Sequence, residues 1–589
     1  MRRTRLSPAA SVRRLVIAVF AAILIQVASA IAAAPVSSQQ ADMIVTAGRI
    51  WTGNPDQPFA EAVAIRGDRI LAVGTRADMM ARRGAHTRVI DMPDRFVTPG
   101  FIDNHTHFQS AGNLLLNVNL LDVADEAGLI RKVREARDRL PRGAWLLDGQ
   151  WGAYEQWALN ATGREQDQRA GPGFSPQRAM IDSITPTTPV LINKWDRTAY
   201  MANSRALELA GADCSWPGVE CENDRPTGRL NAEAAARIRR TVPPKSLEQR
   251  LTESRGALRH LAELGVTTIH DNTPAGQLEV FQLLLAADEL TARIYARPTL
   301  DRYDELSAAG IRHGFGNDYL KIGGLKGFVD GIMGASSARF YEPYLTTGVR
   351  GSWRTMMTES PGMLPLILGA DSTGHWPQVH AIGDEAIDTL LDMYEYVIRT
   401  NGPKERRFRV IHTQVMRGPD VAQRMARLGI IAEVQPYHAI DDMRWMEERI
   451  GSERSRWAYA FKTLHDAGVT LSFGSDWPGT NAAWYTASPL QGMYAATTRQ
   501  TLDGNPPEGW FPQERIDVET ALRAYTVNNA WVAGEEKVKG SIEPGKLADL
   551  VVIEEDLFQV PTTRLKDLNV LMTIVGGRVV YHAAGPGTD

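Results

Sequence analysis

Cysteine is nearly absent from this chain of 589 residues, which contains only Cys214 and Cys221. Two thiols are too few for a cysteine-based metal site, which needs about four ligands. Their close spacing favours a small loop disulfide in an oxidising compartment. No cysteine stands directly after the apolar run near the N-terminus, and this excludes a lipoprotein.

Runs of basic residues are also missing. Lys and Arg number 65 against 69 Asp and Glu, which gives a net charge of −4. The body of the chain has no basic stripe, and this argues against a nucleic-acid partner. Repeats and low-complexity tracts are absent as well. With 43% apolar and 23% charged residues, the composition excludes a disordered or collagen-like chain.

The N-terminus has the pattern of a secretory signal. Five arginines precede or flank an apolar run over residues 15–25, and residues 28–30 read Ala-Ser-Ala, as at a cleavage site. The run is short for a membrane span of about 20 residues. We therefore expect a signal peptide over residues 1–30, a periplasmic or secreted mature chain of net charge −9 and no stable membrane anchor. Arg13-Arg14 leaves twin-arginine export open beside general secretion.

The remaining chain divides into β-rich ends and an α/β middle. Short strands and turns over residues 31–95 and 536–589 predict one small β-sandwich built from both chain ends, with a hairpin turn at Gly67-Asp68. Residues 96–535 alternate strands with amphipathic helices, which predicts a (β/α)8 barrel. A stretch rich in Trp, Pro and Gly, about residues 150–245, is the expected insertion.

The middle contains more strand candidates than the eight that a barrel needs. Seven of them fit the barrel pattern directly: 96–102, 266–270, 320–329, 378–381, 408–412, 430–435 and 469–474. Three more, 144–150, 189–196 and 292–300, also qualify, so some of the candidates belong to the insertion. A helix is expected after His380, and another over residues 517–533.

Histidines and one aspartate stand where predicted barrel strands end. Residues 99–107 read Pro-Gly-Phe-Ile-Asp-Asn-His-Thr-His, so His105 and His107 project from one side of a strand and can reach one metal ion. His380, His412 and Asp476 each end a further strand. Side chains at the C-terminal strand ends form the active sites of barrel enzymes. Taken singly, a histidine in such a position is more often a core or loop residue, and the alternative for Asp476 is a helix cap or a turn.

Lys326 lies within an apolar strand, where a charged ammonium is costly unless it is neutralised or paired. Reaction with carbon dioxide would convert it into a carbamate that can bridge two cations. The alternative is a lysine whose stem packs on apolar residues while its charge reaches solvent. Lys321 fits that alternative better than Lys326 does.

Several of these segments together resemble the amidohydrolase superfamily. They are the Pro-Gly-Phe-Ile-Asp-x-His-x-His run, Val-His-Ala-Ile-Gly-Asp at 379–384, the strand-end His412 and Gly-Ser-Asp at 474–476. Leu-Lys-Gly-Phe-Val-Asp-Gly at 325–331, Gln-Pro-Tyr-His at 435–438 and the tail at 540–550 are similar to the family 3 branch that contains N-substituted formamide deformylase. The resemblance extends over about residues 42–582.

The resemblance implies a hydrolase with two divalent metal ions, zinc being the expected metal. His105 and His107 would bind one ion and His380 and His412 the other, carboxylated Lys326 would bridge them, and Asp476 would bind the first ion and act as general acid/base. A metal-activated hydroxide would attack a non-peptide amide. The implied substrate contacts are His438, which is also a candidate catalytic group, Tyr437, Trp477 and Trp151. The sequence departs from the family at Thr198, where a histidine often lines the substrate pocket.

Two other functions remain compatible with the sequence. One is a mononuclear deaminase or cyclic-amidine hydrolase on the same barrel, in which His412 is a catalytic group. The other is a secreted, non-catalytic regulatory protein that keeps the scaffold. The expected partner is a small-molecule substrate, and self-association into a homo-oligomer is compatible with the sequence.

Overall fold

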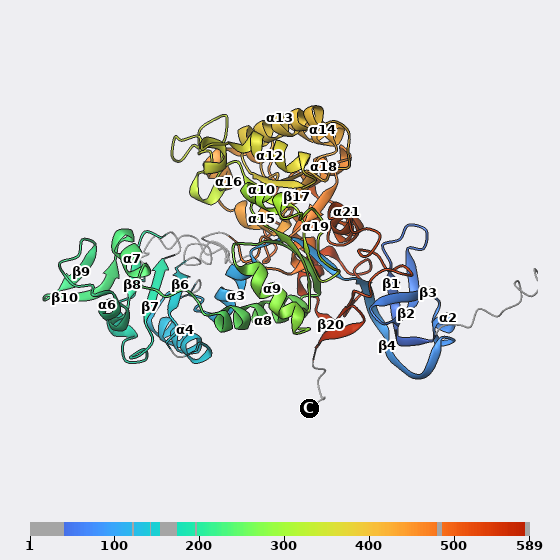
Figure 1. The fold of residues 1–589 in the computed structure, drawn as a ribbon, viewed down its shortest axis with the longest axis horizontal. Coiled ribbons are helices and arrows are strands. Elements are labelled where there is room, and N and C mark those ends of the chain that lie inside the picture. The colour runs from blue at the N-terminus through green and yellow to red at the C-terminus, as the bar shows by residue number, and fades with distance from the viewer. Residues whose placement is uncertain are drawn as a thin grey trace, which may run out of the picture.

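The computed structural model describes residues 40–120, 123–141, 143–152, 174–194, 197–479 and 486–583. A barrel of parallel strands forms the centre, with an inserted sheet on one side and a sheet from the chain ends on the other (Figure 1). The predicted signal peptide lies outside the described residues. In the described part of the chain, no helix is long and apolar enough to cross a membrane.

Two parallel sheets close into the barrel. One has the order β13-β12-β11-β5 and the other the order β14-β15-β16-β17-β18. Their bounds are β5 (Phe101–Thr106), β11 (Val266–Asn272), β12 (Arg293–Arg297), β13 (Leu320–Ile322), β14 (Leu325–Phe328), β15 (Pro377–Ala381), β16 (Arg409–His412), β17 (Ile431–Val434) and β18 (Leu471–Phe473). Because β13 and β14 are two pieces of one barrel strand, the described residues supply the predicted eight. The (β/α)8 prediction is confirmed.

Hydrogen bonds join the two sheets at both seams. The Lys326 amide donates to the Pro298 carbonyl at 2.8 Å on one side. On the other, the Asp476 amide donates to the His105 carbonyl at 2.8 Å. The second seam therefore places Asp476 directly beside the His-x-His segment.

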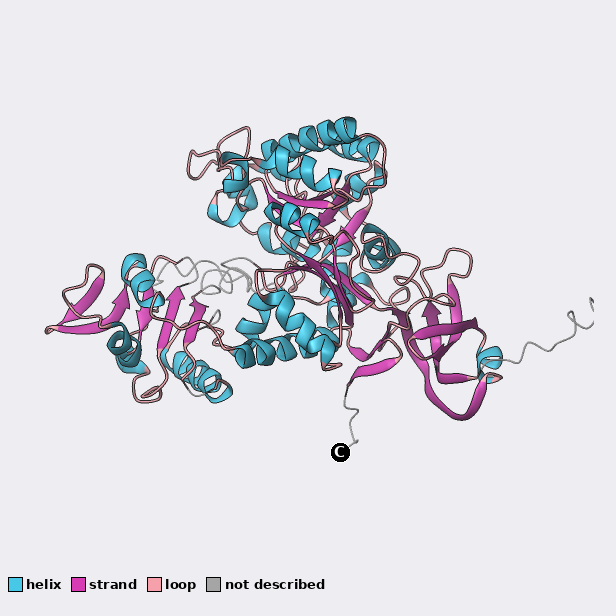
Figure 2. Cartoon of the chain, in the orientation of Figure 1, coloured by secondary structure: helices cyan, strands magenta, loops and turns pink. Residues whose placement is uncertain are grey.

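Helices cover the outside of the barrel (Figure 2). They are α3 (Phe108–Leu116), α8 (Leu247–Glu263), α9 (Gln277–Ala286), α10 (Tyr303–Ala308), α12 (Met363–Ser372), α13 (Asp384–Asn401), α14 (Pro419–Leu428), α18 (Phe461–Asp466), α19 (Pro489–Thr498), α20 (Val518–Ala524) and α21 (Val527–Val532). On α13, Ile387, Leu390, Leu391 and Tyr394 are fully buried on one face. Burial of such apolar stripes against the strands, rather than helix propensity, stabilises this layer.

Three predicted elements are interrupted in the structure. The strand expected over residues 96–102 breaks at Gly100, where a Cβ atom would lie 2.1 Å from the Thr267 hydroxyl. The strand expected over 320–329 breaks between Ile322 and Leu325, and the helix expected over 517–533 is two helices, α20 and α21. Periodicity predicts these elements but does not locate the breaks, because a contact with a residue distant in the sequence, such as Thr267 at Gly100, is not part of a local pattern.

The two chain ends form one sheet of order β21-β20-β19-β4-β1-β2-β3. Its strands are β1 (Ala41–Trp51), β2 (Phe59–Arg66), β3 (Arg69–Gly74), β4 (Arg83–Pro99), β19 (Leu550–Ile553), β20 (Val570–Val575) and β21 (Arg578–His582). A short helix, α2 (Arg76–Met80), follows β3. Arg293 of the barrel donates to both oxygens of Asp549 at 2.7 and 2.8 Å, and this buried pair fixes the sheet to the barrel.

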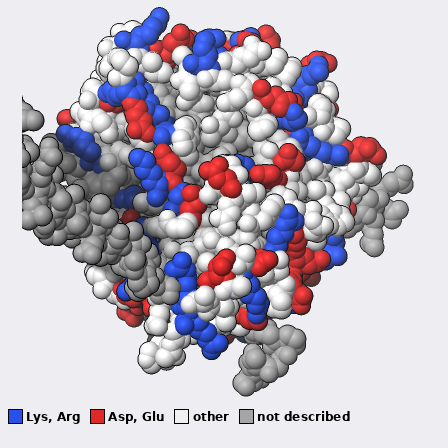
Figure 3. Space-filling model, turned by 90° about the vertical axis from the view of Figure 1, so that its right-hand side faces the viewer, with Lys and Arg blue, Asp and Glu red and all other residues white. Residues whose placement is uncertain are grey.

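Acidic and basic side chains are interspersed on the face of the molecule that includes this terminal sheet (Figure 3). Neither sign gathers into a continuous area there. Among the residues that the structure describes, this face therefore has no patch of a single charge sign.

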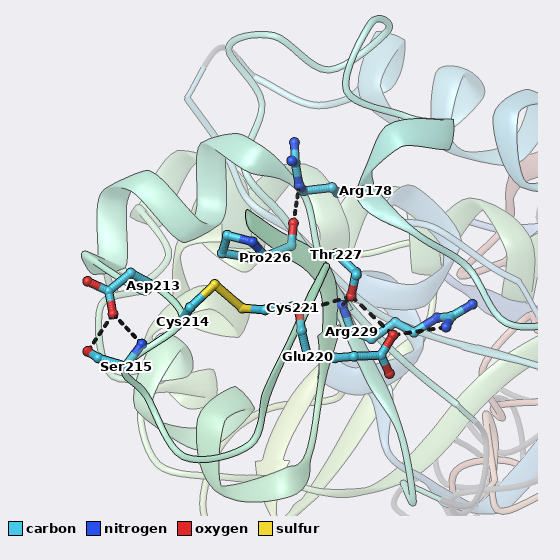
Figure 4. The surroundings of a disulfide bond; sticks show 9 residues. All are labelled: Arg178, Asp213, Cys214, Ser215, Glu220, Cys221, Pro226, Thr227 and Arg229. Carbon is cyan, nitrogen blue, oxygen red and sulfur yellow. Dashed lines mark hydrogen bonds and ion pairs between the residues drawn. A yellow bond between two sulfur atoms is a disulfide. The ribbon is translucent and has the colours of Figure 1, made fainter. Parts of the chain in front are cut away.

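The insertion contains a separate sheet of order β6-β7-β8-β10-β9. Its strands are β6 (Leu146–Trp151), β7 (Val190–Lys194), β8 (Tyr200–Ala202), β9 (Val219–Glu222) and β10 (Arg225–Leu230), and α4 (Glu126–Arg139), α6 (Ser204–Ala210) and α7 (Ala232–Arg239) accompany them. The sheet and its helices thus begin before residue 150. Of the three additional strand candidates, only 292–300 belongs to the barrel, as β12. Cys214 and Cys221 form a disulfide at the outer edge of this sheet (Figure 4).

Candidate metal centre

The sequence-predicted metal ligands meet at the C-terminal end of the barrel. His105, Lys326, His380 and His412 lie in β5, β14, β15 and β16, respectively, while Asp476 follows β18 and His107 precedes α3. Parallel strands direct their carboxyl ends to the same rim, so residues from strands far apart in the sequence become neighbours.

His105, His107 and Asp476 form a first group of potential ligands. Their ligand atoms lie within 4.8 Å of one another. The Nε2 atoms of His105 and His107 are 3.4 and 3.0 Å from Oδ1 of Asp476. This buried oxygen has no hydrogen-bond partner among the described residues. A buried carboxylate facing two imidazole nitrogens is the environment that a divalent cation fits.

His412, His438 and Asp476 form a second group with the same 4.8 Å limit. The Nε2 atom of His438 lies 3.9 Å from Oδ2 of Asp476. The family resemblance predicts His380, rather than His438, as the partner of His412 in binding the second metal ion. The His380 ring lies 4.6 Å from that of His412, but its Nε2 is 2.9 Å from the Gly331 carbonyl. Asp476 is common to both groups, so the two sites adjoin each other.

Two buried acceptors orient the imidazoles. Nδ1 of His105 lies 2.7 Å from a carboxylate oxygen of Glu433, and Nδ1 of His412 lies 2.7 Å from Oε1 of Gln435. A histidine that donates its Nδ1 proton keeps Nε2 as a lone pair for a metal ion. The sequence analysis identified neither Glu433 nor Gln435 as a site residue. Glu433 had the same signal as Lys326, a charged residue inside an apolar strand.

The electrostatics favour ligand-competent histidines. Burial lowers the pKa of His105 and of His412, and the nearby charge of Lys326 acts in the same direction on both. Burial alone would raise the pKa of Asp476, yet His105 and His107 hold it well below its usual range. Neutral imidazoles beside an ionised carboxylate are the protonation states that bind metal.

Lys326 is 2% exposed, and its Nζ lies 3.5 Å from Nε2 of His105. Burial lowers the pKa of the Lys326 ammonium to about 7, and the charge of Arg297 acts in the same direction. Lys321, by contrast, points elsewhere and pairs with Glu535 at 2.6 Å. Of the two lysines, only Lys326 reaches the histidine cluster.

Close backbone contact fixes the turn that carries Asp476. A Cβ atom at Gly474 would lie 2.2 Å from Oδ1 of Asn104, so glycine is required where β18 meets β5. Asp103 accepts from the amides of both His105 and Ser475 at 3.0 Å. Asp476 itself has a left-handed φ of 58°. Such strained backbone is maintained at functional sites by the surrounding contacts.

The predicted substrate contacts are dispersed. Trp477 is fully buried and stacks on His260 at 5.3 Å, while Trp151 is 2% exposed within the core of the inserted sheet. Tyr437 is partly buried and packs on the main core beside His438. The structure thus brings His438 to the cluster and turns both tryptophans into apolar cores.

Asn272 is a site residue that sequence reasoning missed. It ends β11, and its Nδ2 lies 2.8 Å from Nε2 of His105 and 3.2 Å from Nε2 of His107. A polar residue at the end of a barrel strand was the available signal. Its other amide atom, Oδ1, is buried without a partner in the described part of the chain.

A cavity of about 580 Å³ opens from His107 toward the inserted sheet. Its described lining comes from the barrel rim and from the insertion: His107, Ser110, Asn113, Leu114, Asp148, Gln150, Asn193, Arg197, Tyr200, Arg239, Ile332, Arg354, Pro478 and Gly479. The size suits a small-molecule ligand. The cavity joins the histidine cluster to the insertion, where specificity residues can be placed without altering the barrel.

A family model described as amidohydrolase matches residues 88–581. The chain is 31% identical over 563 residues to the protein LONG AFTER FAR-RED 3 of Arabidopsis thaliana, with 92% of each chain covered. It is 27% identical to N-substituted formamide deformylase of Arthrobacter pascens, covering 93% of this chain and all of that one.

Solved structures share the fold. An uncharacterized metal-dependent hydrolase from Pyrococcus furiosus superposes with a TM-score of 0.68 at 25% identity, covering 88% of this chain and 100% of that one.

Proposed function

The chain belongs to the amidohydrolase family and is a metal-dependent hydrolase of that superfamily. On that premise, we propose that it cleaves the carbon–nitrogen bond of a small non-peptide amide. We further propose that the reaction uses two divalent cations, with zinc as the expected metal. The observation that carries this proposal is the pair of adjoining ligand groups that share Asp476. Lys326, buried beside His105, is the proposed bridging residue.

Hydrolysis forms a carbon–oxygen bond, breaks the carbon–nitrogen bond and moves a proton from water to the leaving nitrogen. Divalent cations, when bound, polarise a carbonyl oxygen and lower the pKa of water to about 7 in favourable sites. Asp476 accepts the proton from the attacking water and donates it to the leaving nitrogen. Glu433 and Gln435 keep His105 and His412 in the ligand tautomer throughout.

His438 belongs to the second ligand group, but where His380 and His412 hold that ion, as the resemblance implies, its ring is placed to bind the substrate carbonyl or to assist proton transfer. Its side chain is 6% exposed and faces Asp476. Burial lowers the pKa of His438 to about 4, so the ring is neutral at neutral pH. A neutral imidazole in this position can donate one hydrogen bond without repelling a cation.

Metal removal tests the proposal. We expect about two zinc-like ions per chain by elemental analysis, complete loss of hydrolysis after chelation and recovery on adding Zn²⁺. The assay uses N-formyl and N-acyl amines beside lactams, carbamates and esters. His107→Ala should lose metal, whereas His86→Ala, at an exposed position in β4, should not. Full activity without metal, or hydrolysis of esters alone, contradicts the proposal.

We further propose that the protein is exported. The bonded Cys214 and Cys221 support an oxidising compartment. Mass spectrometry of periplasmic material should find a mature chain that starts near Ile31 and contains no free thiol. Breaking the small disulfide loop should cost about 2–3 kcal/mol of stability. A full-length N-terminus in that material, or two free thiols, contradicts the prediction.

A further inference from the structure

The charges around the cavity are mainly of one sign. Its described lining contains three arginines, Arg197, Arg239 and Arg354, against one carboxylate, Asp148. The chain as a whole has a net charge of −4, so this excess of positive charge is local. A concave, partly enclosed space lined by cations concentrates anions.

One arginine is already neutralised. Nη2 of Arg239 lies 2.5 Å from Oδ1 of Asp148. Among the described residues, no carboxylate lies within ion-pair distance of Arg197 or Arg354. Two positive charges therefore face the cavity without a countercharge from the described protein.

The backbone at both of these arginines is held in place. Arg197 has a left-handed φ of 59°, and its amide donates to the Lys194 carbonyl at 2.9 Å. Arg354 donates its amide to the Val329 carbonyl at 2.9 Å and its Nε to the Asp330 carbonyl at 3.2 Å. Among the described residues, no hydrogen-bond or ion-pair partner lies at its two terminal nitrogens, which leaves them open to a ligand. One arginine comes from the insertion and the other from the loop after β14, and both line the same cavity.

We propose that the substrate is an amide that bears a carboxylate, and that Arg197 and Arg354 bind this carboxylate while the amide lies at the histidine cluster. The proposal rests on the proposed function for the identity of the scissile bond. A guanidinium pairs with a carboxylate through parallel N–H donors, which orients a substrate as well as attracting it. His107 lines the same cavity, so one small molecule can contact both ends.

Arg197 lies where the insertion borders the cavity, and it forms part of the cavity lining. A cationic side chain at this edge selects for charge on the substrate, and this deepens the expectation that the substrate differs from a neutral amide.

Binding measurements test the proposal without relying on turnover. Calorimetry on the metal-free protein would compare N-formyl and N-acetyl amino acids with their neutral carboxamides. We expect at least one acid to bind about 10- to 100-fold more tightly than its carboxamide, a preference that salt weakens. Arg197→Met and Arg354→Met, which keep an apolar stem, should each reduce this preference about 10-fold. Arg259→Met, on α8 and outside the cavity lining, is the matched control.

A further variant should change the affinity for the acids in the opposite direction. Asp148→Asn removes the one described carboxylate of the lining and releases Arg239, so it should tighten binding of the acids. In the metal-loaded enzyme, the arginine variants should raise KM for acids and leave the neutral amides within about 2-fold. If no acid binds more tightly than its carboxamide, or if both arginine variants keep the preference, the proposal is wrong. Tight binding of acids without hydrolysis of any amide would contradict the proposed function alone.

Discussion

Lys326→Ala should lose one of the two metal ions of the proposed site and reduce turnover at least about 100-fold. Mutating a residue that only hydrogen-bonds to a metal ligand already lowers metal affinity or activity about 10- to 100-fold, and a bridging ligand should matter more. The Lys326 amine is buried 3.5 Å from Nε2 of His105, and the proposed function gives it the bridging role as a carbamate. Elemental analysis and steady-state kinetics on the purified variant provide the measurement. A short-chain carboxylic acid added to this variant should restore part of the metal content and part of the turnover, because it can occupy the space that the lysine side chain leaves.

Two further variants serve as controls for this result. Lys326→Arg should not rescue activity, because a guanidinium stays charged and forms no carbamate. Lys321→Ala should keep two metal ions, since Lys321 pairs with Glu535 instead. If Lys326→Ala retains both ions and near-normal turnover, the bridging role is wrong and the mononuclear hydrolase becomes the better interpretation.

Glu433→Gln should destabilise the folded protein by about 3–5 kcal/mol, the cost of leaving buried charge unpaired. Glu433 is completely buried and lies 2.8 Å from both Arg297 and Arg409, which are also completely buried. Removing the carboxylate leaves two guanidinium groups in the barrel interior without their countercharge. Urea denaturation of the metal-free protein measures the loss, which keeps effects on metal affinity out of the comparison.

The pH dependence of this loss has a defined sign. Burial alone would raise the pKa of Glu433, but Arg297 and the hydrogen bond from His105 hold it well below its usual range. The stabilisation by Glu433 is therefore present above the pKa of an unfolded glutamate and is lost only as the pH falls through the lower folded value. The difference between wild type and variant should be constant near neutral pH and shrink in acid.

Glu514→Gln is the matched control for Glu433→Gln. Glu514 is also buried, but it accepts hydrogen bonds from the amide and hydroxyl of Thr463 rather than from a cation. Its replacement should cost about 1 kcal/mol, as for a neutral hydrogen bond. Equal losses at the two positions would contradict the charge argument for the barrel interior.

The sequence predicted much of the fold from local patterns. Strand-end histidines, the alternation of strands with amphipathic helices and the two β-rich ends indicated a barrel and a small β-sandwich built from both chain ends. Breaks such as Gly100 escaped prediction, since they depend on a neighbour, Thr267, that is distant along the chain. The burial of Trp477 and Trp151 was not predicted either. An aromatic residue beside a predicted site fits an apolar core and a substrate pocket equally well.

By itself, the sequence determined which ligand types this protein has and that they end barrel strands, because strand periodicity and residue chemistry are local properties. Only the tertiary structure decided which of them meet. Closure of β18 against β5 joins Ser475 to Asp103 across 372 residues and so places Asp476 beside both histidines. The inserted sheet likewise brings Arg197 to the cavity that also contains His107. Such contacts depend on how the barrel closes and how the insertion covers its mouth, which no short segment of sequence specifies.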